Sequence, residues 1–147
     1  MEGVTTFSIS ASWDTSAKEG RLANADGSFA AVHTGAPALD GKGGTANPEE
    51  LLLAAVSACF LQTWAIFVEK LKLPIAAPRL DATCALEKDP AGGFHVTRID
   101  LFAHVPAALL DERKADVDKT LSLAEKYCIV SKAVKGSIPI TVTPKPA

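Results

Sequence analysis

A long central helix is predicted by residues 47–71, which read NPEELLLAAVSACFLQTWAIFVEKL. Its start is well marked, because Asn47 is a favourable N-cap, Pro48 fits the first helical position and Glu50 stands where a capping box needs an acceptor. Apolar side chains then occupy nearly every side of the helix, so protein has to bury it on most sides. A single chain of 147 residues can hardly surround such a helix, and we therefore expect a homodimer whose central helices pack together.

The same helix has to be considered as a membrane span. Residues 51–68 carry no charge and are about as long as a minimal spanning helix. Ser57, Gln62 and Thr63 interrupt this stretch, however, and no asymmetry of flanking basic residues sets an orientation. We expect no membrane partner. The alternative is a membrane-associated redox protein, which would partition with lipid.

Strands are predicted on both sides of the helix. Polar and apolar side chains alternate over residues 5–14, a second strand passes near Arg21, and an Asp26-Gly27 turn leads into a third over residues 28–34. After the central helix we expect, in order, strands at 80–86 and 95–105, a helix from Pro106 through Tyr127, a short helical turn at 131–134 and a strand at 138–142. This order predicts an α+β fold in a single domain of residues 1–147, with antiparallel sheets wrapped around central helices.

Composition narrows the classes of function. The net charge is −2 and the basic residues are scattered, so nothing indicates binding to nucleic acid or to an anionic membrane. The first residues lack the basic start and apolar stretch of a signal peptide, which favours a cytoplasmic location. The chain has three cysteines, an odd number unlike the disulfide framework of a small secreted domain.

The cysteines are the residues most suited to chemistry. Cys59 lies inside the apolar run of the central helix, and Cys128 lies at the end of the second predicted helix. If the fold brings them together, they form a thiol pair that can cycle between reduced and disulfide states. Core packing is the simpler interpretation for Cys84, which falls on the apolar face of a strand, and it stays open for the other two.

Other common site chemistries have little support. His33, His95 and His104 share no ligand spacing with one another or with a cysteine, so no metal site is expected. Ser57 and Ser131 have no base next to them in the sequence, which argues against a serine nucleophile.

Three motifs carry a resemblance to a known family. They are TANPEELL at residues 45–52, AAVSACF at 54–60 and CIVSKA at 128–133. Together, in this order and with the Glu49 to Cys59 spacing, they resemble the OsmC/Ohr family of organic hydroperoxide reductases, and the predicted element order agrees over the whole chain.

The resemblance implies a thiol-dependent peroxidase of oxidative stress defence, in an intertwined homodimer that needs no bound cofactor. Cys59 would attack an organic hydroperoxide and become a sulfenic acid, and Cys128 would then form a disulfide with it. In the family, a dithiol such as a lipoyl group restores the reduced enzyme. An apolar pocket beside Phe60 and Trp64 would favour organic hydroperoxides as substrates.

The family also implies a glutamate that holds an activating arginine, and Glu49 matches this glutamate. Arg21 is our first choice for the cation and Lys18 the second, because the family's own arginine positions are not matched here. Glu49 lies ten residues before Cys59, roughly 15 Å along a continuous helix. A long cation must bridge this gap, the helix must break, or Glu49 must serve the partner subunit's site. Ile129 replaces the proline that follows the family's second cysteine.

A binding protein is the main alternative. The same dimer could hold an apolar small molecule in its cleft without peroxidase activity, with the cysteines merely packed. The unmatched arginine keeps this interpretation open, and a double cysteine-to-alanine variant would then still bind its ligand.

Overall fold

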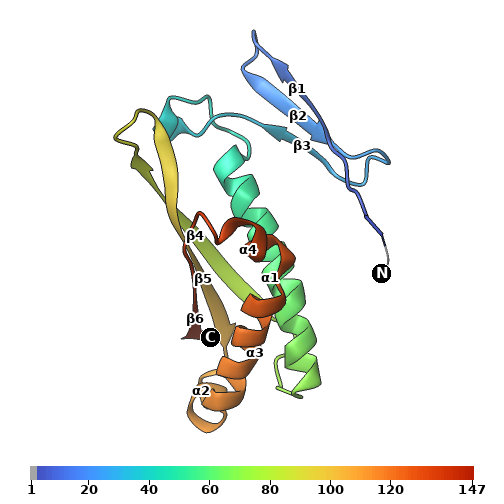
Figure 1. Ribbon diagram of the computed structural model, residues 1–147, viewed down its shortest axis with the longest axis vertical. Coiled ribbons are helices and arrows are strands. Elements are labelled where there is room, and N and C mark those ends of the chain that lie inside the picture. Colours follow the sequence, from blue (N-terminus) through green and yellow to red (C-terminus); the bar gives the residue numbers. More distant parts are fainter. Residues whose placement is uncertain (1–2) are drawn as a thin grey trace. The chain divides into compact units, whose positions relative to one another are not determined.

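The computed structural model describes residues 3–147 and divides into two compact units, Met1–Leu51 and Leu52–Ala147 (Figure 1). The first unit contains a three-stranded sheet, and the second contains another three-stranded sheet with helices packed on it. The predicted α+β class with two sheets is therefore confirmed.

The sheet of the first unit is the predicted antiparallel meander. It is formed, in this order, by β1 (Ser10–Asp14), β2 (Glu19–Ala23) and β3 (Ala30–His33). The first strand is shorter than the predicted 5–14, and its pairing with β2 runs from Ser10 opposite Ala23 to Asp14 opposite Glu19. A short 3-10 helix, η1 (Pro37–Leu39), follows the sheet.

Glycine is required at the centre of this sheet. Gly20 lies between Trp13 on β1 and His33 on β3 in the strand register. A Cβ atom at Gly20 would lie 2.1 Å from Nε2 of His33, so the imidazole occupies the space above the glycine. The rings of His33 and Trp13 are 5.9 Å apart, and together they cover the glycine backbone.

The central helix, α1 (Pro48–Lys70), begins with the predicted capping box. Oδ1 of Asn47 accepts the Glu50 amide over 2.9 Å, and Oε1 of Glu50 accepts the Asn47 amide over 3.3 Å. Within the chain α1 buries one stripe, namely Val56, Phe60, Trp64 and Val68. Other apolar side chains on it stay open, with Ile66 51% exposed. By length and composition α1 could cross a membrane, and 22% of its most apolar window is buried.

The sheet of the second unit is mixed. Strand β5 (Phe94–Val105) pairs antiparallel with β4 (Arg79–Lys88) on one side and parallel with β6 (Ile140–Pro146) on the other. We expected antiparallel pairing and a last strand at 138–142. The parallel pair arises because a helical connection returns the chain to the end of the sheet where β5 began. Strand β6 is an edge strand, so it tolerates Pro144 and Pro146.

Three helices make that connection instead of the single helix and short turn predicted. They are α2 (Ala107–Glu112), α3 (Lys114–Tyr127) and α4 (Ile129–Val134). Arg113 interrupts the predicted helix, with φ −133° and ψ 37°. Its guanidinium donates to the carbonyl oxygens of Leu71 and Lys72 over 3.2 and 3.3 Å, so it satisfies acceptors just beyond the end of α1.

The core of the second unit lies between its sheet and its helices. Alternate residues of β5 are fully buried on one face, namely Ile99, Leu101, Ala103 and Val105. They belong to one apolar cluster with the buried stripe of α1 and with Val117, Leu121 and Ala124 of α3. The indole of Trp64 donates to the hydroxyl of Thr120 over 3.0 Å inside this core. This packing fixes α1 against α3 and so positions the cysteines that these helices carry.

Candidate functional site

Two cysteines far apart in the sequence meet in the second unit. Cys59 lies in the middle of α1 and is half-buried, whereas Cys128 lies at the junction of α3 and α4 and is fully buried. Both are thiols, and they lie close enough for each to shift the pKa of the other, with Cys128 lowering the pKa of Cys59 and Cys59 raising that of Cys128. The fold thus brings the two thiols into each other's neighbourhood.

The surroundings of Cys59 favour its ionised form. Burial alone would raise the pKa of this thiol, but the backbone amide of Val130, the Cys128 thiol, the backbone amide of Ile129 and the Thr63 hydroxyl all donate to the sulfur and together lower its pKa below the ordinary value. Only the thiolate is nucleophilic, so the arrangement suits Cys59 for attack on an electrophile.

Cys128 has the opposite character. Burial raises the pKa of its thiol, and the neighbouring Cys59 raises it further. A hydrogen bond from the Ser131 hydroxyl, 3.0 Å from Sγ of Cys128, partly offsets both effects. The pair is therefore asymmetric: Cys128 holds its proton and Cys59 gives its proton up more readily.

The Thr63 hydroxyl lies one helical turn after Cys59. It donates to the backbone carbonyl of Cys59 over 2.8 Å, and its proximity also lowers the pKa of the Cys59 thiol. Sequence reasoning treated Thr63 only as a polar interruption of an apolar helix. Its spacing of four residues from Cys59 is the signal that could have found it, because such residues share a helix face.

Glu49 lies in the first turn of α1. One of its carboxylate oxygens, Oε2, is buried and has no hydrogen-bond partner among residues 3–147. No ion pair joins Glu49 to Arg21 or to Lys18 in the described part of the chain. Arg21 is exposed on β2, and Lys18 has φ 57° in the β1–β2 turn. The structure therefore brings the two cysteines together and leaves the predicted cation unassigned.

The remaining cysteine and the histidines lie elsewhere. Cys84 is on β4 and packs against the apolar cluster of the second unit. His104 pairs with Asp81 over 2.7 Å, and His95 lies 3.6 Å from Asp89. No group of three potential metal-ligating side chains occurs within residues 3–147.

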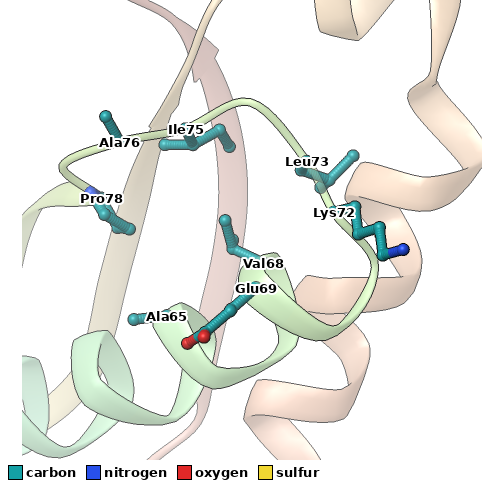
Figure 2. Close-up of a pocket in the computed structure, with 8 residues that line it drawn as sticks. All are labelled: Ala65, Val68, Glu69, Lys72, Leu73, Ile75, Ala76 and Pro78. Atoms are coloured by element: carbon teal, nitrogen blue, oxygen red, sulfur yellow. The ribbon is translucent and has the colours of Figure 1, made fainter.

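Two cavities of the second unit are lined in part by residues of α1. Phe60 and Trp64 are buried in the core, and the cavity that Phe60 lines measures only about 20 Å³. A larger groove of about 470 Å³ lies at the far end of α1 (Figure 2). Its lining includes Val68, Glu69 and Lys72 but neither Cys59 nor Cys128. The predicted pocket beside Phe60 and Trp64 stays a prediction.

Comparison with known proteins gives one consistent family. The sequence model of the family described as OsmC-like protein matches residues 41–143. The chain is 33% identical over 132 residues to an organic hydroperoxide resistance protein of Xanthomonas axonopodis pv. citri, covering 88% of each chain. It is 30% identical over 125 residues to organic hydroperoxide resistance protein-like 2 of Staphylococcus epidermidis, covering 84% of each.

A solved structure shows the same fold. The crystal structure of an organic hydroperoxide resistance protein from Elizabethkingia anophelis superimposes with a TM-score of 0.79 over 100% of both chains, at 22% identity. With the family match over residues 41–143, these findings establish that the chain belongs to the OsmC-like protein family.

Proposed function

We propose that this protein is a cytoplasmic thiol-dependent peroxidase that reduces organic hydroperoxides to alcohols in oxidative stress defence. The observation that carries the proposal is the asymmetric pairing of Cys59 and Cys128, in which the surroundings lower the pKa of Cys59 and raise that of Cys128. The printed names of the relatives in Xanthomonas and Staphylococcus support hydroperoxides as the substrate class.

The proposed reaction has two steps on the enzyme. The Cys59 thiolate attacks one oxygen of the hydroperoxide, the O–O bond breaks, and the alkoxide leaves as the alcohol after taking a proton. Cys59 is now a sulfenic acid. The sulfur of Cys128 then attacks the sulfur of Cys59, the S–O bond breaks, and the hydroxide leaves as water with the Cys128 proton. An external dithiol, which we propose to be of the lipoyl type, reduces the disulfide, and no bound cofactor or metal takes part.

Glu49 is proposed to hold the cation that accompanies the reaction. Its buried oxygen without a hydrogen-bond partner supports this role, because an unpaired buried carboxylate oxygen is costly and a cation would satisfy it. Arg21 remains our first choice and Lys18 the second. Supply of the cation by a partner subunit is equally compatible with the lack of an ion pair to Glu49 in the described chain.

A homodimer is the proposed assembly, and residues 1–147 are proposed to act as a single domain. Apolar side chains that the single chain leaves open support the dimer. Phe7 is 94% exposed in the first unit, and α1 exposes apolar residues outside its buried stripe. Large exposed apolar patches mark interaction surfaces, and a second copy of this chain would cover them. We accordingly propose no membrane and no nucleic acid as partners.

The decisive experiment counts thiols and measures intact mass after one equivalent of cumene hydroperoxide is added to the reduced protein. We expect loss of two thiols and two hydrogens, mapped to a Cys59–Cys128 disulfide. Cys84→Ser should behave like the unmodified chain and serves as the matched control, whereas Cys59→Ser should consume no hydroperoxide.

Three unreacted thiols in the unmodified protein would overturn the peroxidase. Full turnover by Cys59→Ser would remove Cys59 as the nucleophile. The first result would favour the alternative, a binding protein for an apolar small molecule, whereas the second would leave a peroxidase that uses another nucleophile.

A further inference from the structure

The Ser131 hydroxyl is buried beside the cysteine pair and has no part in the reaction described so far. Ser131 is 4% exposed, and its hydroxyl donates to Sγ of Cys128 over 3.0 Å. A buried hydroxyl could instead donate to the backbone of its own helix, as serine often does. Here its partner is the sulfur of Cys128.

The hydrogen bonds around the pair run in one direction. Ser131 donates to Cys128, and Cys128 in turn lowers the pKa of Cys59, as a hydrogen-bond donor to its sulfur would. A group that accepts one hydrogen bond becomes a better donor in the next, so such chains strengthen cooperatively. This series of interactions ends at Cys59, which is the cysteine that carries the negative charge of the resting pair.

We propose that Ser131 is a positioning residue for the resolving step: its hydroxyl orients the Cys128 sulfur toward Cys59 and stabilises the charge that develops on Cys128 as it attacks. This inference rests on the proposed peroxidase function. It assigns a role to the one hydroxyl that contacts the second cysteine, within the part of the chain that the structure describes.

The resolving step shows why such a donor is needed. When Cys128 attacks the sulfenic acid, the Cys128 S–H bond breaks, its proton joins the departing hydroxide as water, and the new bond is Cys59–Cys128 S–S. Charge builds on the Cys128 sulfur as that proton leaves, in a fully buried place where unpaired charge is costly. Ser131 keeps its own proton throughout and supplies a hydrogen bond to that charge. Consistent with this, its hydrogen bond lowers the pKa of Cys128 against the opposing effect of burial.

The experiment separates the two chemical steps in Ser131→Ala. Loss of hydroperoxide reports the attack by Cys59, and peptide-mapped disulfide reports resolution by Cys128. Dimedone traps any sulfenic acid that waits between them. We expect the first step to keep its rate within about twofold, disulfide formation to slow roughly tenfold, and the dimedone adduct on Cys59 to accumulate.

Three further variants make the result specific. Ser131→Thr keeps the hydroxyl and should restore fast resolution. Ser137→Ala removes an exposed hydroxyl just after α4 and should behave like the unmodified chain. Ser131→Gly is a second variant that lacks the hydroxyl, and each variant is assayed below its own melting temperature.

Two outcomes would overturn the inference in different ways. Disulfide formation at the unmodified rate in a folded Ser131→Ala or Ser131→Gly, without a dimedone adduct, would remove Ser131 from the resolving step and leave the peroxidase intact. If the unmodified protein itself forms no disulfide with hydroperoxide, the proposed function falls and the role of Ser131 falls with it.

Discussion

At the residue scale, the two cysteines have the same side chain but different surroundings. Cys59 receives hydrogen bonds from backbone amides, a thiol and a hydroxyl, whereas Cys128 is enclosed by the core and keeps its proton. Because of this difference, Cys59 ionises to the thiolate more readily and Cys128 stays protonated. A redox pair built in this way has a built-in order of events, with Cys59 first.

The lowered pKa of Cys59 predicts how its reactivity depends on pH. The thiolate fraction rises with pH, so alkylation of Cys59 by iodoacetamide, followed by peptide mass mapping, should reach its half-maximal rate below the ordinary pKa of a thiol. Thr63→Val removes a donor to the Cys59 sulfur. We expect its midpoint to move to higher pH and the rate at pH 7 to fall about two- to fivefold.

Two threonine variants control this prediction. Thr63→Ser retains the hydroxyl and should retain the midpoint of the unmodified chain. Thr83→Val changes an exposed threonine on β4 and should have no effect on Cys59. A Thr63→Val profile that coincides with the original would show that the hydroxyl serves only the backbone carbonyl of Cys59.

The hydrogen bond between Trp64 and Thr120 gives a stability prediction. Trp64→Phe removes the donor and some buried volume, and we expect the free energy of unfolding to fall by about 2 kcal/mol. Combined with Thr120→Val in a double-mutant cycle measured by urea unfolding, the pair should show a coupling of about 1 kcal/mol. If the effects of the two substitutions on the unfolding free energy are strictly additive, the loss in Trp64→Phe comes from the reduced buried volume alone.

Part of this residue-level picture could be predicted from the sequence. Cys59 and Cys128 stand out because recognisable motifs surround them. The amides of Ile129 and Val130 could not be predicted as donors, because a backbone N–H carries no side-chain signal. They point at Cys59 only because the chain turns from α3 into α4 beside α1. The partner of Glu49 is unassigned for a related reason: the sequence displays several cations and no rule of spacing selects among them.

At the element scale, the start of α1 follows directly from local sequence. Asn47 and Glu50 cap each other's backbone amides, as the capping-box pattern predicts. Asn47→Ala should lower the free energy of unfolding by about 1 kcal/mol, measured in urea, because one amide of the first turn loses its acceptor. Glu50→Gln, which keeps an acceptor oxygen, is the matched control and should cost far less. Equal losses would show that the Glu50 charge, rather than its hydrogen bond, stabilises the helix start.

The break at Arg113 is an element-level feature that periodicity could not reveal. The apolar stripe runs on from α2 into α3, so the sequence reads as one helix. The guanidinium leaves the helix line to reach the carbonyls of Leu71 and Lys72, and its Nε also contacts Asp116 over 3.0 Å. Hydrophobic periodicity relates residues only a few positions apart, so it cannot predict a long-range contact of this kind.

Arg113 yields a prediction with a clear comparison. Arg113→Ala should lower the free energy of unfolding by about 1–2 kcal/mol in urea, because carbonyls at the end of α1 lose a charged donor. Arg98→Ala removes an arginine that is 61% exposed and pairs only on the surface of the second sheet, so it should cost less than about 0.5 kcal/mol. Similar losses of unfolding free energy for both variants would mean that Arg113 stabilises the fold only through its surface pair with Asp116.

At the scale of the whole molecule, the apolar surface of α1 has to be accounted for. The sequence predicts a helix surrounded by protein, yet the single chain buries only one stripe of it. What covers the rest could not be predicted from the sequence, because a pattern of apolar residues does not identify the surface that packs against them. The parallel pairing of β6 is a similar case, since strand direction depends on where three connecting helices return the polypeptide.

The homodimer is tested by sedimentation. One chain has a mass of 15.3 kDa, and we expect a particle of twice that mass at micromolar concentration. Ile66→Asp places a charge on the open side of α1 and should shift the population toward monomer, because a buried unpaired charge opposes association. Phe94→Asp changes an exposed apolar residue at the start of β5 and serves as the comparison. A monomer at all concentrations would leave the open face of α1 to another partner.

The contact of Cys59 with Cys128 has a consequence for the unfolded chain. A disulfide there would tie together positions about 70 residues apart, and restricting so long a loop stabilises the native state by about 4 kcal/mol in the chain-entropy model. Each oxidation would then raise the melting temperature and each reduction would lower it again. A thermal melt would therefore report the fraction of the protein that is in the disulfide form and has not yet been reduced.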